Sequence, residues 1–369
     1  LNQRGEVLLE EFHRNRREAL EAFRGRSAET GAAQKKPDYL RALVSALDID
    51  AREFTPILGG DYQLMARFES DPAEKLFGMG QYQQPYLNIK GCTLELAHRK
   101  SQASVPFVLS SLGYGFLWHN PAIGKASFGT NVTEWYAQST DILDYWITAG
   151  DTPAEIEEAY ARATGTVPMM PEFAMGFWQC KLRYRTQDEL LEVAREYKRR
   201  NLPISVIVAD FFHWPNQGDW KFDREYWPDP KAMIDELKDM GIELMVSVWP
   251  TVEDGSENYR EMEERGYLIR ADRGNRIMLS DASIFDATHP GAREFVWSKV
   301  RQNYYDDGIK IFWLDEAEPE YTHYHYDIYR YHLGPDVQIG NIYPVVYARA
   351  FFEGMSAAGQ EKVINLLRC

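Results

Sequence analysis

Four apolar runs of this chain end on, or next to, a residue that could take part in chemistry. Those residues are Asp210, Trp249, Asp315 and Arg368. Side chains alternate between the two faces of a strand, so sequence parity decides which of them can share a cavity. We predict that all four face one shallow pit with aromatic walls. Two carboxylates, a guanidinium and indole rings in such a pit could hold a polar, uncharged ring and supply nucleophilic or acid–base chemistry.

Asp315 gives the sharpest of these signals. It closes the apolar run 309–315 and opens the acidic cluster DEAEPE at 315–320. Enzymes that hydrolyse glycosidic bonds with retention use one carboxylate as nucleophile and a second carboxyl, roughly 5 Å away, as acid and then base. Asp315 and Asp210 are compatible with that chemistry. The alternative is that each acid only caps the loop or helix after its strand, and spacing alone leaves both interpretations open.

Further aromatic side chains could line the same pit. Phe212 has the parity of Asp210. Trp313 has the parity of Asp315, and Trp178 lies in the first apolar run after residue 171. Flat aromatic faces can bind the C–H faces of sugar rings, but the tryptophans could equally fill the top of the core.

Arg368 needs an acidic partner if it lies in a parallel strand, and Asp315 or Asp210 would supply one. The histidines show no metal-ligand spacing, so we expect loop or supporting roles for them; they include His213, His289, His323 and His325. We expect neither a metal nor an organic cofactor. The run YTHYHYDIYRYH (321–332) could wall the site or contact a neighbouring subunit, which leaves a homo-oligomer open.

Composition narrows the class of protein. At 369 residues the chain is long enough for two domains. The formal net charge of −15 argues against nucleic acid and against an anionic membrane surface as partners. No apolar run is long enough to span a membrane, and no leader is visible, so we expect a cytoplasmic protein. Because the chain opens with Leu1, its true N-terminus is expected to be missing.

The chain divides into three regions. Residues 1–50 begin with the strand-like GEVLLEEF and continue as a charged helical connector. Residues 51–165 contain short β-type runs separated by turns, which is typical of a β-sandwich, and close on a helix at 151–165. From residue 166 to 369, apolar strands alternate with helices, which indicates a parallel α/β domain. The expected strands are 173–180, 204–212, 242–249, 309–315 and 362–369; the expected helices are 186–200, 229–241, 291–308 and 343–359.

A TIM barrel or a doubly wound sheet would satisfy that alternation. No Gly-rich phosphate loop follows any strand, and candidate functional residues end several different strands, so the barrel is favoured. Closure needs eight strands and only five are visible. We therefore predict an N-terminal β-sandwich followed by a (β/α)8 TIM barrel that is incomplete in this chain, with the remainder beyond Cys369.

The ordered motifs resemble glycoside hydrolase family 31 over about residues 51–369. FWLDEAEPE (312–320) resembles the family's nucleophile strand, and LFGMGQYQQ (76–84) resembles the glycine-containing segment of its N-terminal, mutarotase-like sandwich. The other matching motifs, in order, are GFWQCKLRYRTQDEL (176–190), VIVADFFHW (206–214), VSVWP (246–250) and VINLLRC (363–369).

The resemblance implies a role for each matching residue. Asp315 matches the catalytic nucleophile, and Glu318 matches a supporting glutamate. Asp210 matches the acid that holds sugar hydroxyls in the −1 subsite, while Trp249 and Arg368 match residues that accompany it. The family's acid/base is an Asp in a W-x-G-D type segment, which is not in this chain.

The implied function is a retaining, exo-acting α-glycosidase that releases a terminal sugar from an oligosaccharide or other α-glycoside through a covalent glycosyl-enzyme. The segments GFWQCKLRY and WLDEAEPE are most similar to those of α-xylosidases, although Trp313 stands where some of these carry lysine. An α-glucosidase, an α-galactosidase or a transglycosylase is the alternative on the same scaffold. A non-catalytic carbohydrate-binding protein is the alternative from another class.

Overall fold

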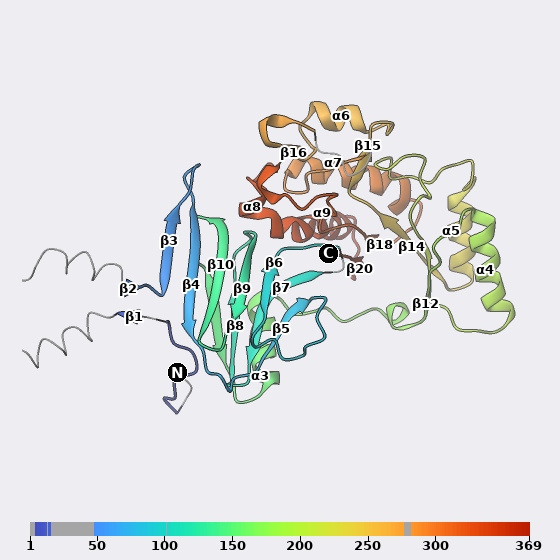
Figure 1. Cartoon of the computed structure of the whole chain (residues 1–369). Coiled ribbons are helices and arrows are strands. Elements are labelled where there is room, and N and C mark those ends of the chain that lie inside the picture. Colours follow the sequence, from blue (N-terminus) through green and yellow to red (C-terminus); the bar gives the residue numbers. More distant parts are fainter. Residues whose placement is uncertain (1–3, 13, 16–47, 101, 277–281) are drawn as a thin grey trace, which may run out of the picture. The chain divides into compact units, whose positions relative to one another are not determined.

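The computed structural model describes residues 4–12, 14–15, 48–100, 102–276 and 282–369 (Figure 1). The chain forms two compact units. Unit 1 comprises Leu1–Leu96 and Ser104–Gly165, and unit 2 comprises Ala97–Ala103 and Thr166–Cys369. The predicted charged helical connector falls mostly outside the described residues. At its edges, β1 (Arg14–Asn15) pairs antiparallel with β2 (Asp48–Ile49).

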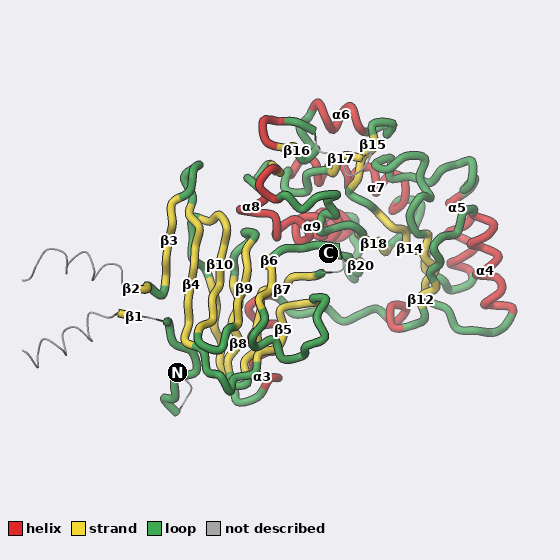
Figure 2. Tube along the Cα trace, in the orientation of Figure 1, coloured by secondary structure: helices red, strands yellow, loops and turns green. Residues whose placement is uncertain are grey.

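Besides the β1–β2 pair, the described residues of unit 1 form two larger antiparallel sheets, as the sequence predicts (Figure 2). In the first, the strand order is β3 (Arg52–Pro56), β4 (Tyr62–Glu69), β10 (Val132–Thr140), β9 (Gly124–Phe128) and β6 (Thr93–Leu96). In the second it is β11 (Tyr145–Ala149), β8 (Tyr114–Trp118), β7 (Ala103–Ser110) and β5 (Leu76–Gln81). The sheets share one aromatic core, because Phe116 of the second lies 4.9 Å from Trp135 and 5.2 Å from Phe68 of the first, between ring centroids.

The N-terminal run GEVLLEEF does not form the predicted strand. Within residues 5–12 only Glu11 makes a bridge, to Phe68, where β3 no longer covers the end of β4. Two backbone hydrogen bonds, Phe12 N to Arg67 O and Glu69 N to Glu10 O, hold this short contact. Two ladder bonds are too few for a strand, so the apolar alternation here was misleading.

The helix predicted at 151–165 is present as α3 (Pro153–Thr164). Thr152 caps it, since its hydroxyl accepts a hydrogen bond from the backbone N–H of Glu155 at 3.3 Å. Pro153 occupies the first turn, where its missing N–H costs nothing, and Ile156 is the buried contact residue.

Unit 2 is built on a parallel sheet, five-stranded in the described residues. Its order is β12 (Trp178–Gln179), β13 (Val206–Ala209), β14 (Glu243–Val248), β18 (Ile311–Leu314) and β20 (Asn365–Leu367). The helices between strands are α4 (Gln187–Arg199), α5 (Pro230–Asp239), α7 (Pro290–Val300) and α9 (Tyr343–Ala357). Spatial order follows chain order with no reversal, as in a TIM barrel and unlike a doubly wound sheet. The barrel prediction and its partial extent are confirmed.

Several details of unit 2 differ from the predicted elements. The first apolar run begins as a 3-10 turn (Glu172–Met175), because Ala174 N and Gly176 N bond locally to Pro171 O and Phe173 O, which leaves a two-residue strand. The helix after residue 290 ends in a π turn (Arg301–Tyr305). Unpredicted short elements are β15 (Thr251–Glu253), α6 (Tyr259–Glu264), β16 (Arg270–Ala271), β17 (Ala282–Ile284), β19 (Tyr329–Arg330) and α8 (Asp336–Ile339).

The two faces of the parallel sheet bury different rows of side chains. One row forms a cluster of Val206, Val208, Met245 and Ile311, with Trp178 and Trp313 packed against it. The opposite row faces the helices; Phe312, for example, lies 5.4 Å from Phe351 of α9 between ring centroids. The first row has the parity of the candidate functional residues, so it leads up to them.

Candidate active site

Asp315 follows β18 directly and is fixed on both carboxylate oxygens. Its backbone N–H continues the sheet by donating to Val248 O at 3.1 Å. Oδ2 accepts a hydrogen bond from Trp249 Nε1 at 3.0 Å, and Oδ1 accepts one from the Glu316 backbone N–H at 3.0 Å. Only 5% of the residue is exposed. The carboxylate is therefore held in one orientation at the C-terminal end of the sheet.

Arg368 gathers the acidic side chains around Asp315. It follows β20, and its backbone N–H donates to Leu314 O at 3.1 Å. Its Nε lies 3.0 Å from Asp315 Oδ1 and 3.2 Å from Glu318 Oε1, while Nη2 lies 2.7 Å from Glu320 Oε2. Burial disfavours the charged form of Arg368, but the Glu318 and Asp315 carboxylates keep its pKa above the usual value. The acidic partner that the sequence required is Asp315, together with two further glutamates.

Asp210 lies one residue beyond β13 and is 6% exposed. Its Oδ1 accepts a hydrogen bond from the backbone N–H of Phe211 at 2.8 Å, and its Oδ2 lies 4.0 Å from the Cys180 thiol. Burial raises the pKa of Asp210, and the negative charge of Asp315 adds to the rise. The two candidate carboxylates are thus close enough to influence each other.

The loop after β18 carries more carboxyl groups than positive charges. Burial raises the pKa of Asp315 and of Glu318, against the opposing effect of Arg368. Burial, with the Glu320 and Asp315 carboxylates, raises the pKa of Glu316 to about 8. Glu316 therefore stays largely protonated at neutral pH, and its Oε2 has no hydrogen-bond partner among the described residues.

Aromatic rings surround Trp249. Phe211 stacks on it at 5.3 Å between centroids, and Phe212 and Trp214 lie at 5.7 and 5.6 Å. Phe212 is 43% exposed, and the guanidinium carbon of Arg183 lies 5.4 Å from the centroid of its ring. Trp178 and Trp313 are partly buried and pack on the inner apolar cluster. Of the predicted aromatic residues, Trp249 contacts Asp315 and Phe212 contacts Trp249.

Sequence reasoning missed several residues here. Phe211 was not among the predicted site residues, because strand alternation through Asp210 and Phe212 would turn it to the opposite face; β13 ends at Ala209, so alternation no longer applies to it. Cys180 has the parity of Trp178, a signal that could have placed it beside the site. Glu320 belongs to the acidic cluster already noted. Lys100, which contacts Glu320 at 2.8 Å, comes from a distant loop and carries no sequence signal.

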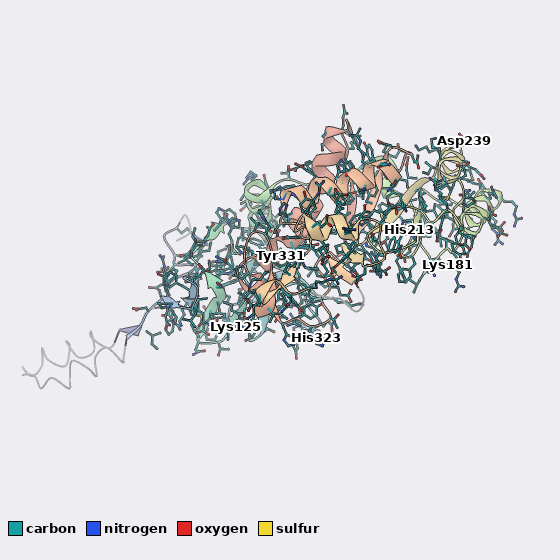
Figure 3. The ribbon with its side chains drawn as sticks, turned by 90° about the horizontal axis from the view of Figure 1, so that it is seen from above. Lys125, Lys181, His213, Asp239, His323 and Tyr331 are labelled. Atoms are coloured by element: carbon teal, nitrogen blue, oxygen red, sulfur yellow. The ribbon has the colours of Figure 1, made fainter. Side chains whose placement is uncertain are left out.

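The histidines have supporting positions. His213 is labelled in Figure 3. It is buried, with its Nδ1 2.9 Å from the backbone carbonyl oxygen of Asp210 and its Nε2 2.8 Å from the Tyr304 hydroxyl. Burial lowers the pKa of His213 to about 4, so the ring is neutral and holds the loop that carries Asp210. His289 accepts a backbone hydrogen bond at the start of α7. The parts of the chain that the structure describes contain no cluster of three or more side chains suited to a metal ion.

The tyrosine-rich run 321–332 packs within unit 2. Its tyrosines Tyr321, Tyr326, Tyr329 and Tyr331 are buried, and the hydroxyls of Tyr321 and Tyr331 are hydrogen-bonded to each other. A contact of this run with a neighbouring subunit stays a prediction. Among the described residues, no helix has the length and apolar character needed to cross a bilayer.

Comparison with known proteins places these elements in a family. Residues 167–368 match the domain described as the TIM-barrel domain of glycosyl hydrolases family 31. The chain is 58% identical to a family 31 glucosidase of Pseudescherichia vulneris described as uncharacterized, covering all of this chain and 68% of that protein. It is 34% identical to α-xylosidase A of Aspergillus niger, over 84% of this chain and 45% of that protein.

Among solved structures, a family 31 α-xylosidase from a soil metagenome, complexed with xylose, superposes with a TM-score of 0.89 at 62% identity. The alignment covers all of this chain and 53% of that one, so the chain spans about half the length of that relative. The match of the barrel domain, the identity to these relatives and the shared fold agree. This chain belongs to glycosyl hydrolase family 31.

Proposed function

We propose that this chain supplies the nucleophile and most of the sugar-binding side chains of a retaining α-glycosidase that removes terminal α-xylose. The observation that carries the proposal is the Asp315 carboxylate, fixed by Trp249 at 3.0 Å and by Arg368 at 3.0 Å where four parallel strands end. An oriented carboxylate in a partly dry site is suited to attack on carbon, since little reorganisation precedes the reaction.

In the proposed reaction, an Asp315 oxygen attacks the anomeric carbon as the bond to the leaving oxygen breaks. A carboxylic acid, which we do not assign to any residue of this chain, gives its proton to that oxygen. The product is a β-glycosyl ester of Asp315. Water then attacks the same carbon, gives a proton to the conjugate base and frees the carboxylate, so two inversions retain the configuration.

The neighbouring side chains have distinct proposed roles. Asp210, which is buried and close enough to Asp315 for that charge to raise its pKa, accepts hydrogen bonds from sugar hydroxyls. Phe212, which is 43% exposed and lies against Trp249, stacks on the sugar or the leaving group. Glu318 acts indirectly, since it contacts Arg368 at 3.2 Å and thereby helps to orient it. Trp178 and Trp313 stay predicted as substrate-binding residues.

The relatives support xylose as the preferred sugar. The 62% identical solved structure is named an α-xylosidase and holds xylose, and the Aspergillus relative is also named an α-xylosidase. An α-glucosidase is the second candidate, because the 58% identical relative is named a glucosidase. The two sugars differ by one hydroxymethyl group, and a pocket discriminates a group of this size by only about 1–3 kcal/mol.

The test compares aryl α-xyloside and aryl α-glucoside hydrolysis by the full-length protein and by Asp315→Ala. We expect a higher kcat/KM for the xyloside, α-xylose as the first product by NMR, and a loss of at least about 10⁴-fold in Asp315→Ala. A fluorinated xylosyl fluoride should trap an ester on Asp315, found by peptide mass spectrometry. Wild-type turnover with an active Asp315→Ala variant, or a label on another carboxylate, would contradict the assignment.

Two other outcomes would redirect the proposal. Sugar binding without any turnover would favour a non-catalytic carbohydrate-binding protein. New glycosides among the products, or a preference for α-galactosides, would favour a transglycosylase or an α-galactosidase.

A further inference from the structure

Residues 97–103 connect two strands of unit 1, β6 and β7, yet they group with unit 2. The Arg99 guanidinium carbon lies 4.6 Å from the centroid of the Tyr324 ring, a cation–π distance. The backbone N–H of Lys100 donates to the Tyr324 hydroxyl at 3.1 Å. Arg99 and Lys100 are therefore held beside Tyr324, in the segment that follows β18.

Lys100 ends a line of alternating charges that leads to Asp315. Its Nζ lies 2.8 Å from Glu320 Oε1, and the other oxygen of Glu320 lies 2.7 Å from Arg368 Nη2. Arg368 Nε in turn lies 3.0 Å from Asp315 Oδ1. Glu320 thus bridges a lysine from the loop and the arginine that contacts the candidate nucleophile.

Charge balance explains why a second cation is needed. Asp315, Glu318 and Glu320 all contact the one guanidinium of Arg368. Without Lys100, three carboxylates would compete for a single positive charge. The hydrogen bond to Glu320 raises the pKa of Lys100, which keeps it an ammonium group. Although burial opposes ionisation of Glu320, Lys100 and Arg368 hold its pKa below the usual value.

We infer that Lys100 is a positioning residue for Asp315: it neutralises Glu320 and so leaves the Arg368 guanidinium free to stay in contact with the Asp315 carboxylate. The inference rests on the proposed function of Asp315 as nucleophile. It gives Lys100 a role in the chemistry through Glu320, which it contacts, and Arg368.

Loss of Lys100 should act on Asp315 in two ways. Glu320 would keep its charge with Arg368 as its main partner, which would draw the guanidinium away from Asp315. The uncompensated charge of Glu320 would also disfavour ionisation of Asp315 directly. Both effects move the acidic limb of the kcat/KM profile to higher pH. The other titratable or charged groups facing Asp315 or Glu320 are Asp210, Glu316, Glu318, Tyr324, Tyr347 and Arg368.

The experiment is a pH profile of aryl α-xyloside hydrolysis by the full-length protein, Lys100→Met and Lys100→Arg. In Lys100→Met we expect the acidic limb of the kcat/KM profile to move to higher pH by about half a pH unit. This is the size expected for one uncompensated charge in partly solvated surroundings. Lys100→Arg should restore the wild-type limb. The matched control is Lys125→Met in unit 1; Lys125 is labelled in Figure 3. The Lys125 ammonium lies 5.7 Å from the centroid of the Tyr136 ring, and its removal should leave the pH profile unchanged.

A second substitution separates charge from structure. Adding Glu320→Gln to Lys100→Met removes the uncompensated charge and should bring the limb back toward the wild-type position. An unmoved limb in Lys100→Met, or a uniform loss of kcat/KM at every pH that Glu320→Gln fails to reverse, would overturn the inference. Failure of the proposed function would look different, since the wild-type protein would then be inactive or Asp315→Ala active.

Discussion

Removal of the Arg368 guanidinium should destabilise the fold as well as the site. In Arg368→Met the apolar stem is kept, but the charge that contacts Asp315, Glu318 and Glu320 is lost. Asp315 and Glu318 are only 5% and 3% exposed, so water cannot replace the missing partner. The protein must then either bury unpaired carboxylates or protonate them.

The size of the effect follows from burial. Breaking a buried ion pair by removing one partner costs about 3–5 kcal/mol, because the other charge is left uncompensated. The Arg368 side chain is 33% exposed. Since solvent already screens part of its interaction, we expect the low end of the range, about 3 kcal/mol of unfolding free energy at neutral pH.

The pH dependence has a defined sign. Without Arg368, the buried carboxyls keep their protons to a higher pH in the folded state than in the unfolded state. The folded state then binds more protons between the two pKa values, so stability falls as the pH rises through that window. The loss of unfolding free energy in Arg368→Met relative to the wild-type protein should therefore be larger at pH 7.5 than at pH 5.

Urea unfolding followed by tryptophan fluorescence measures both quantities. Arg349→Met is the matched control, because Arg349 lies on α9, is 54% exposed in its side chain and meets Glu353 only at 3.9 Å. That surface pair should change the unfolding free energy by less than about 1 kcal/mol. If Arg368→Met unfolds like the control, or if its deficit does not vary with pH, the reasoning about buried charge is wrong.

Three further substitutions test separate contacts. Trp249→Phe removes the hydrogen bond to Asp315 Oδ2, so the acidic limb of kcat/KM should rise by about 1 pH unit; an unchanged limb would contradict this. Glu316 has a pKa of about 8 in the folded protein against about 4.5 when unfolded, so wild-type stability should fall as pH rises through that window. In urea unfolding, the stability of Glu316→Gln relative to the wild-type protein should increase from pH 5 to pH 8. A stability difference that stays constant over this range would refute the raised pKa of Glu316. In Gly124→Ala the new Cβ would lie 1.9 Å from the backbone oxygen of Tyr136, so unit 1 should lose about 1–3 kcal/mol, and an unchanged melting temperature would show that the strand yields.

The predictable part of this protein is the part governed by burial. Parallel strands covered on both faces appear as continuous apolar runs, and four of the five were located to within a few residues. The starts of two helices could also be predicted from the sequence, because Thr186 and Asp229 are typical N-cap residues. Their side chains cap α4 and α5 in the structure. Asp315 and Arg368 could be grouped because neighbouring parallel strands end at one edge of the sheet.

The rest depends on loop geometry, which no periodicity encodes. The alternation that placed Phe212 beside Asp210 also excluded Phe211, yet Phe211 stacks on Trp249 because the strand ends before it. Lys100 lies more than two hundred residues from Glu320 in the sequence, and a lysine in a charged loop gives no signal of a specific partner. The shortness of β12 follows from local hydrogen bonds around the 3-10 turn at Glu172–Met175, which compete with the sheet.

Sheet register, rather than loop contacts, sets the alignment of the candidate nucleophile. Val248 pairs with Leu314, and Leu314 pairs with Leu367, so Trp249, Asp315 and Arg368 each stand one residue beyond a paired position. A slip of one residue in β18 would turn Asp315 toward the helices and bring Leu314 to its place. The hydrogen bonds that carry the ladder on, from Asp315 N to Val248 O and from Arg368 N to Leu314 O, oppose such a slip. The loops beyond the strands add the charges that tune Asp315, so substitutions there should change its ionisation before they change its position.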